Sequence, residues 1–277
     1  MRRKITILFV VLYNLGIVSA NAFDDLLFMP LVANHLEARI GSFYQFDDER
    51  LRLDIGHSLD LFEFDLSNAN KNKSHQLIDK IRVGADFFIL SRLRSEGRLK
   101  FPVETADYFF GVNTSSNIKL LNELFSTRLR LAHISSHLID GYSDSSKFWK
   151  APFIYSREFV DLVIAYNNKY LRPYIGCSYI FSTQPKSVSK FVPEFGFDFN
   201  HEMCSFLGVS GGYDLKVVGG ENLSSVVSNS IQTGLDFILS KNIKLSLNYY
   251  YYSGYSIHGM FYDSKDKYSG FGFEIKY

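Results

Sequence analysis

The alternation that decides the fold is clearest in the last seven residues, Phe271-Gly272-Phe273-Glu274-Ile275-Lys276-Tyr277. The odd-numbered positions of this stretch are aromatic or aliphatic, whereas the even-numbered ones are small or charged. Because neighbouring side chains of an extended strand point to opposite faces, one face of this segment is apolar and the other is polar. The stretch therefore predicts a β-strand that separates an apolar environment from a polar one.

The same period of two residues recurs along most of the chain and is interrupted by turn residues. In 244–251, for example, Leu245, Leu247 and Tyr249 share a face, and Lys244 and Ser246 share the opposite face. We predict about twelve strands, at 37–46, 50–66, 79–93, 103–113, 123–138, 155–167, 170–183, 188–200, 203–217, 225–239, 241–253 and 268–277.

The beginning of the chain has the pattern of a secretory signal peptide. Arg2, Arg3 and Lys4 precede a mostly apolar stretch over 5–18, and Ala20-Asn21-Ala22 supplies the small residues of a cleavage site. The alternative is an uncleaved anchor, but the apolar part is shorter than the roughly 20 residues of a membrane span. We expect export and cleavage after Ala22.

An exported chain without an apolar helix can cross a membrane only as a closed barrel. We therefore expect an all-β protein: a signal peptide over 1–22, a periplasmic segment over 23–36, and a closed antiparallel transmembrane β-barrel of about 12 strands over 37–277. A soluble β-sandwich also has alternating strands. The polar faces here mix both signs of charge with glycine, which suits a narrow, filled lumen better than a surface in bulk water. A wide general porin needs about 16 to 18 strands.

The composition excludes several classes of function. The formal net charge is +1, so no basic field for nucleic acid is present. The 18 tyrosines and 26 phenylalanines suit the aromatic girdles of a membrane barrel. No phosphate-binding loop, dinucleotide fingerprint or metal-ligand spacing is found, so neither a cofactor nor a metal is expected.

The most specific chemical pattern is His133-x-Ser135, at the end of the predicted strand 123–138. Both residues share the face of Leu129 and Leu131, which should face lipid, and Glu158 has the same outward parity on the next strand. In a hydrolase, Ser135 would be the nucleophile, His133 the general base and Glu158 the carboxylate that orients the base. Alternatively, these residues lie above the hydrocarbon and bind headgroups or loop backbone, or a bulge turns them inward.

Three segments carry a family resemblance. They are Arg128–Leu138, Tyr155–Gly176 and the aromatic run Tyr251–Tyr262, and Phe28–Ala33 matches the family's start. Together they resemble an uncharacterised bacterial family of outer-membrane β-barrels, catalogued as a domain of unknown function. The family's first motif usually continues into Gly-Asp-Glu, whereas this chain has Ile139-Asp140-Gly141. The terminal strand is likewise similar to the one that the barrel-insertion machinery reads.

The resemblance implies a location rather than a reaction: the bacterial outer membrane, with the lipid bilayer, lipopolysaccharide and the insertion machinery as partners. The His133-x-Ser135 pair is locally similar to outer-membrane phospholipase A and lipid A deacylase, which place such a pair on the outer wall beside an Asn or Glu of a neighbouring strand. The expectation is an outer-membrane barrel of unknown specific role. The alternatives are an outer-leaflet lipid acyl hydrolase and a narrow channel or structural barrel whose lumen is plugged by charges.

Overall fold

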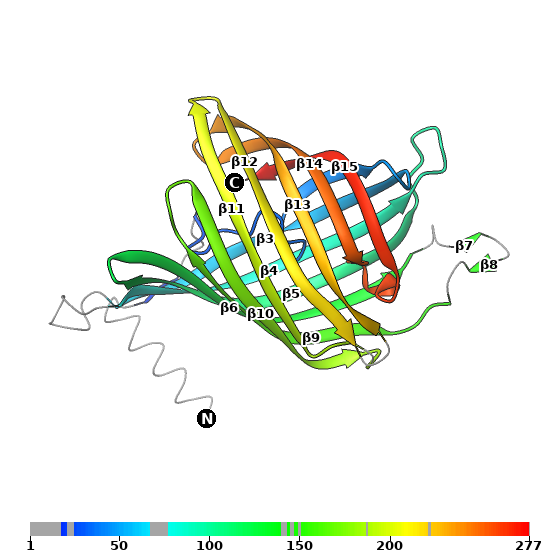
Figure 1. The fold of residues 1–277 in the computed structure, drawn as a ribbon, viewed down its shortest axis with the longest axis horizontal. Helices are drawn as coiled ribbons and strands as arrows, with labels where there is room; N and C mark the ends of the chain where they lie inside the picture. The colour runs from blue at the N-terminus through cyan, green and yellow to red at the C-terminus, as the bar shows by residue number, and fades with distance from the viewer. Residues whose placement is uncertain are drawn as a thin grey trace.

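The computed structural model describes residues 18–20, 25–66, 77–139, 143–144, 147–148, 151–186, 188–220 and 223–276. Within these residues, twelve antiparallel strands form a closed barrel (Figure 1). Strand β3 closes the barrel because it pairs with both β2 and β4. The strands are β2 (Ile40–Gln45), β3 (Arg50–Asp65), β4 (Ile78–Arg94), β5 (Val103–Leu120), β6 (Glu123–Leu138), β9 (Tyr155–Tyr166), β10 (Leu171–Gln184), β11 (Phe191–Cys204), β12 (Leu207–Gly220), β13 (Leu223–Ser240), β14 (Ile243–Tyr255) and β15 (Lys265–Lys276).

Three short strands accompany the barrel. Strand β1 (Val18–Ala20) pairs with the end of β3, at Phe62 to Phe64. Strands β7 (Ser143–Asp144) and β8 (Lys147–Phe148) form a separate pair between β6 and β9. In the described part of the chain, no helix is long and apolar enough to cross a membrane.

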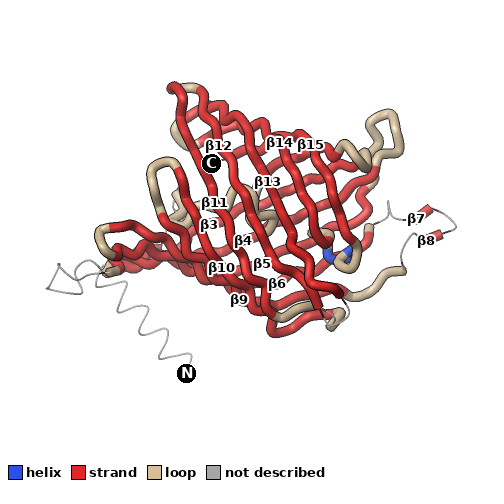
Figure 2. Tube along the Cα trace, in the orientation of Figure 1, coloured by secondary structure: helices blue, strands red, loops and turns tan. Residues whose placement is uncertain are grey.

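The two ends of the barrel differ. At one end, two-residue turns at 121–122, 205–206 and 241–242 join three pairs of strands, the connections 66–77 and 167–170 join two further pairs, and β2 begins close to the end of β15. We call this the turn end. The opposite end carries the connections 139–154 and 256–264, and we call it the loop end. Figure 2 shows the short helix η3 (Gly259–Phe261) at the loop end, beside β14 and β15.

The expected fold class and strand phase are confirmed. Asp86, Asp161 and Asp236 are buried inside the barrel, at 3%, 3% and 2% exposure. Phe87 and Leu162, their neighbours in sequence, are 45% and 38% exposed on the outer wall. A wall that buries its charges and exposes its large apolar side chains is the inverse of a soluble protein, which indicates that the outer wall contacts lipid.

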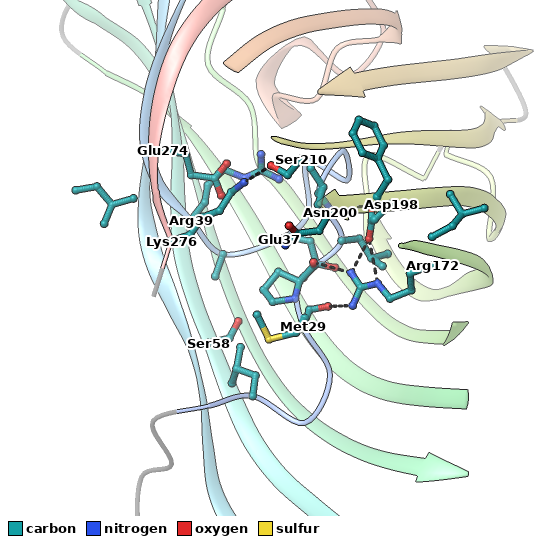
Figure 3. A pocket seen from close by; sticks show the side chains of 18 of the residues that line it. Met29, Glu37, Arg39, Ser58, Arg172, Asp198, Asn200, Ser210, Glu274 and Lys276 are labelled. Atoms are coloured by element: carbon teal, nitrogen blue, oxygen red, sulfur yellow. Dashed lines mark hydrogen bonds and ion pairs between the residues drawn. The ribbon is translucent and has the colours of Figure 1, made fainter. Parts of the chain in front are cut away.

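The segment that precedes the barrel lies inside it. A periplasmic segment was expected over 23–36, and for the described residues 25–36 this expectation is wrong. The amide of Val32 donates to Asp198 at 3.1 Å, and the side-chain amide of Asn34 donates to Glu194 at 2.7 Å. Arg172 contacts the carbonyl of Met29 at 2.9 Å (Figure 3). The segment enters because its own polar groups bond the charged residues of the wall. We call residues 25–39 the plug.

The connection 256–264 closes the loop end. His258 Nδ1 lies 2.7 Å from Asp107 Oδ2, and the amide of Gly259 donates to Asp107 Oδ1 at 2.7 Å. The amide of Met260 donates to Ser136 Oγ at 3.1 Å, and Met260 is 1% exposed. We call residues 256–264 the cap. The lumen is therefore filled by the plug and closed by the cap, which leaves no place for a wide pore within the described residues.

Candidate active site

The residues that the sequence singled out lie on the outer wall, where β6 and β9 approach the loop end. The two strands pair so that His133 lies opposite Glu158 and Ser135 lies opposite Ser156. Because β6 runs toward the loop end and β9 runs away from it, residues 25 positions apart become cross-strand neighbours. Leu131, on the same face of β6, is 51% exposed, so this face belongs to the lipid-contacting wall.

His133 and Glu158 contact each other directly. His133 Nδ1 lies 2.9 Å from Glu158 Oε1, and the two side chains are 41% and 31% exposed. A neutral imidazole that donates from Nδ1 to a carboxylate keeps Nε2 as an acceptor. Glu158 Oε2 is buried and has no hydrogen-bond partner among the described residues. The geometry provides an oriented imidazole, which is the state a general base requires.

Ser135 is the third residue of the expected constellation. It is half-buried on the same face as His133, two positions further along β6. No hydrogen bond between His133 and Ser135 is found, although both residues lie in the described part of the chain. The structure therefore brings His133 and Glu158 together and places Ser135 beside them, without a direct bond to the base.

Ser136 points the other way, as expected from the strand phase. It is 2% exposed, faces the lumen and accepts the hydrogen bond of Met260 from the cap. Its hydroxyl also lies 3.3 Å from that of Thr105 on β5. The two neighbouring serines thus have separate environments: Ser135 lies on the outer wall, and Ser136 holds the cap.

Two features of the interior were missed by sequence reasoning. The first feature is the plug, which no period-2 pattern predicts. It contains Glu37 and Arg39, whose buried charges pair with residues of the wall. The second feature is a buried aromatic cluster on the inner face of β14. Tyr250 and Tyr252 face inward, at 7% and 4% exposure, and belong to this cluster.

No group of three or more His, Cys, Asp or Glu side chains within the described residues is arranged to hold a metal ion. Cys177 and Cys204 are free cysteines. The chemistry available at the outer-wall site is therefore that of a serine, an imidazole and a carboxylate.

Comparison with known proteins places the chain among outer-membrane β-barrels. Residues 16–277 match the model of the family described as Protein of unknown function (DUF1207), and the chain belongs to that family. Among curated proteins, none matches this chain. The resemblance expected from the three sequence segments is thereby confirmed.

Solved structures of outer-membrane phospholipase A share the fold. The Escherichia coli enzyme aligns with a TM-score of 0.50 and 14% identity, over 86% of this chain and 92% of that chain. An active-site mutant of the same enzyme aligns with a TM-score of 0.52 and 13% identity, over 91% of this chain and 93% of that chain. The Salmonella typhi phospholipase dimer with bound calcium aligns with a TM-score of 0.52 and 14% identity, over 88% of this chain and 94% of that chain. At these identities the likeness shows the fold alone: this chain folds as a closed β-barrel of the kind seen in outer-membrane proteins.

Proposed function

We propose that the protein is a lipid acyl hydrolase that acts in the outer leaflet of the outer membrane. The observation that carries the proposal is the 2.9 Å contact between His133 and Glu158 on the lipid-facing wall, two positions from a serine on the same face. An ester-bond substrate anchored in the bilayer meets this wall by lateral diffusion. A nucleophile that points outward is therefore useful only against a lipid.

The reaction follows the logic of serine hydrolases. A rotation of the two side chains toward each other lets the Ser135 hydroxyl donate to His133 Nε2. The Ser135 oxygen attacks the ester carbonyl while His133 takes the hydroxyl proton, and His133 returns that proton to the leaving lipid alcohol. Water, activated by the same imidazole, then releases the fatty acid from the acyl-enzyme. Glu158 holds the imidazole and stabilises its protonated form.

The orientation of the barrel supports the outer leaflet. Outer-membrane barrels have short turns in the periplasm and longer loops outside, so the turn end would face the periplasm and His133, near the loop end, would face the outer leaflet. Lipopolysaccharide would then surround this part of the wall. Consistent with this orientation, we propose export with cleavage after Ala22, which would remove β1 from the mature protein, and insertion by machinery that reads β15. Cell fractionation and N-terminal sequencing of the mature protein test this route.

Ser135→Ala tests the reaction. The folded barrel in detergent micelles, supplied with phospholipid and lipid A esters, should release fatty acid. In the Ser135→Ala variant the rate of this release should be lower by at least about 10³-fold. Ser156→Ala is the matched control, because Ser156 lies opposite Ser135 on the same outer face. Wild-type protein without hydrolysis, or Ser135→Ala with full activity, would show that the proposal is wrong.

A second candidate is a structural barrel with a closed lumen, and the plug favours it. Glu37 is 1% exposed and contacts Arg128 and Arg130, and further buried ion pairs join the plug to the wall. A lumen filled in this way does not conduct solutes while the plug is in place. If the protein neither hydrolyses lipid esters nor conducts ions, the structural role is the candidate that remains.

A further inference from the structure

A small cavity lies inside the barrel at the loop end, between the plug and the cap. Its volume is about 90 Å³. The plug contributes His35, the wall contributes Arg157 and Lys216, and the cap contributes Ser256 and Tyr262. One water molecule needs only about 10–15 Å³ of such space, so the cavity can hold a group of several heavy atoms.

The charged side chains that line this cavity directly have one sign. Arg157 and Lys216 are among the lining residues, and no described aspartate or glutamate is among them. The remaining polar groups of the lining are largely hydroxyls, from Ser178, Ser228, Tyr252, Tyr255 and Ser256. A cavity that is lined by cationic side chains and by the unpartnered hydroxyl of Ser228, with no carboxylate among its described lining residues, is suited to an anion.

Arg157 differs from the other arginines that face the lumen. Its Nε is buried and has no hydrogen-bond partner, and among the described residues it forms no ion pair. Its guanidinium lies 5.1 Å from the centre of the Tyr155 ring, a cation–π contact. The lumen arginines that do form ion pairs with described carboxylates are Arg39, Arg52, Arg82, Arg92, Arg128, Arg130 and Arg172.

Two other groups complete the cavity. His35 Nδ1 is buried and has no partner among the described residues. The His35 ring stands edge-on to Tyr252, with 5.9 Å between the ring centres, so its orientation is fixed by packing. Lys216 Nζ is held by Asp214 at 2.6 Å and by Glu194 at 3.1 Å, which neutralise its charge. Among the described residues, the uncompensated charge of the cavity is therefore that of Arg157.

We propose that this cavity binds a small oxyanion and that Arg157 is the main residue that binds it. A planar guanidinium matches two oxygens of a phosphate or carboxylate group. Bound there, the oxyanion supplies the acceptor that Arg157 Nε lacks, and the His35 ring nitrogen and the Ser228 hydroxyl, which also have no partner, supply further donors. This site faces the lumen and is separate from the outer wall where hydrolysis is proposed, so neither proposal depends on the other.

Isothermal titration of the folded barrel with inorganic phosphate, and separately with acetate, tests the site. Wild-type protein should bind at least one of these probes saturably at one site per chain. Arg157→Gln should weaken binding about tenfold or more, because it removes a charged hydrogen-bonding partner. Arg98→Gln is the matched control, since Arg98 is exposed in the connection 95–102 at the same end; it should bind as wild type does.

A second variant keeps the proposal testable if Arg157→Gln does not refold. His35→Ala removes a donor from the plug side of the cavity and should also weaken binding. Wild-type protein that binds neither phosphate nor acetate would overturn the proposal, and the cavity would then hold only water. Binding that is equally strong in wild type, Arg157→Gln and His35→Ala would overturn it as well, because the anion would then sit elsewhere.

Discussion

Both carboxylate oxygens of Glu37 accept hydrogen bonds from the guanidinium of Arg128, at 2.8 and 2.6 Å, although 91 positions separate the two residues. Glu37 and Arg128 are 1% and 3% exposed. The bond joins the plug to the middle of β6 and makes the interior of the barrel a network of paired charges. A buried charge is tolerated only while its partner is present, so the plug and the wall stabilise each other.

The first prediction concerns this pair. Glu37→Ala leaves Arg128 buried without its carboxylate and should lower the free energy of unfolding by about 3–5 kcal/mol. Urea unfolding of the barrel in lipid vesicles measures the change. Glu96→Ala is the control, because Glu96 pairs with Arg94 at 2.6 Å in an exposed connection and should cost at most about 1 kcal/mol. Equal costs for the two variants would mean that the plug contributes little to stability.

The second prediction concerns the outer wall. Val112 lies near the middle of β5 and is 57% exposed, and Leu120 ends the same strand at 50% exposure. Val112→Arg should cost about 2–4 kcal/mol because it places a charge in the hydrocarbon, whereas Leu120→Arg should cost about 0–1 kcal/mol near the interface. Refolding titrations in lipid vesicles compare the two. A larger cost at Leu120 would contradict the proposed position of the bilayer on β5.

The third prediction concerns the closed lumen. A chain without residues 25–36 keeps all twelve strands of the wall but loses the bonds of Val32 to Asp198 and of Asn34 to Glu194. Water should then hydrate the exposed charges, so the variant should show discrete conductance steps in a planar bilayer. The full-length protein, measured in the same bilayer, should stay closed. Conductance of the full-length protein at the same level would mean that the plug does not block passage.

The strands could be predicted because alternation is a local property. Asp86 and Phe87 are adjacent in sequence, and their opposite faces follow from the geometry of an extended chain. The plug could not be predicted in this way, because its partners are distant in sequence: 160 positions separate Asn34 from Glu194. Nothing in the pattern of 25–36 distinguishes a segment in the lumen from a segment in the periplasm.

The candidate site was predictable in part. The outward parity of His133 and Glu158 follows from their neighbours on each strand, Leu131 and Leu162. Their register does not, since a connection as long as 139–154 permits several alignments of β6 with β9. The structure places His133 directly opposite Glu158. The catalytic roles of these residues and of Ser135 stay predictions, because side-chain orientation alone does not establish turnover.

The fourth prediction separates orientation of the base from simple stability. Glu158→Ala removes the acceptor that fixes His133, so kcat on lipid esters should fall by about 10²-fold or more, while KM should change little. Glu158→Gln keeps an oxygen that can accept from Nδ1 and should retain more activity than the alanine variant. Urea unfolding of both variants checks that the barrel is intact.

The matched control uses the other end of the same two strands. Glu123 on β6 accepts a hydrogen bond from the hydroxyl of Tyr166 on β9 at 2.6 Å, so it also joins these strands through a carboxylate. Glu123→Ala should leave kcat unchanged, because Glu123 lies at the turn end, far along both strands from His133. If the two alanine variants lose activity equally, Glu158 acts by holding β6 to β9 rather than by orienting the base. If Glu158→Ala alone loses kcat at unchanged stability, the contact between His133 and Glu158 serves catalysis.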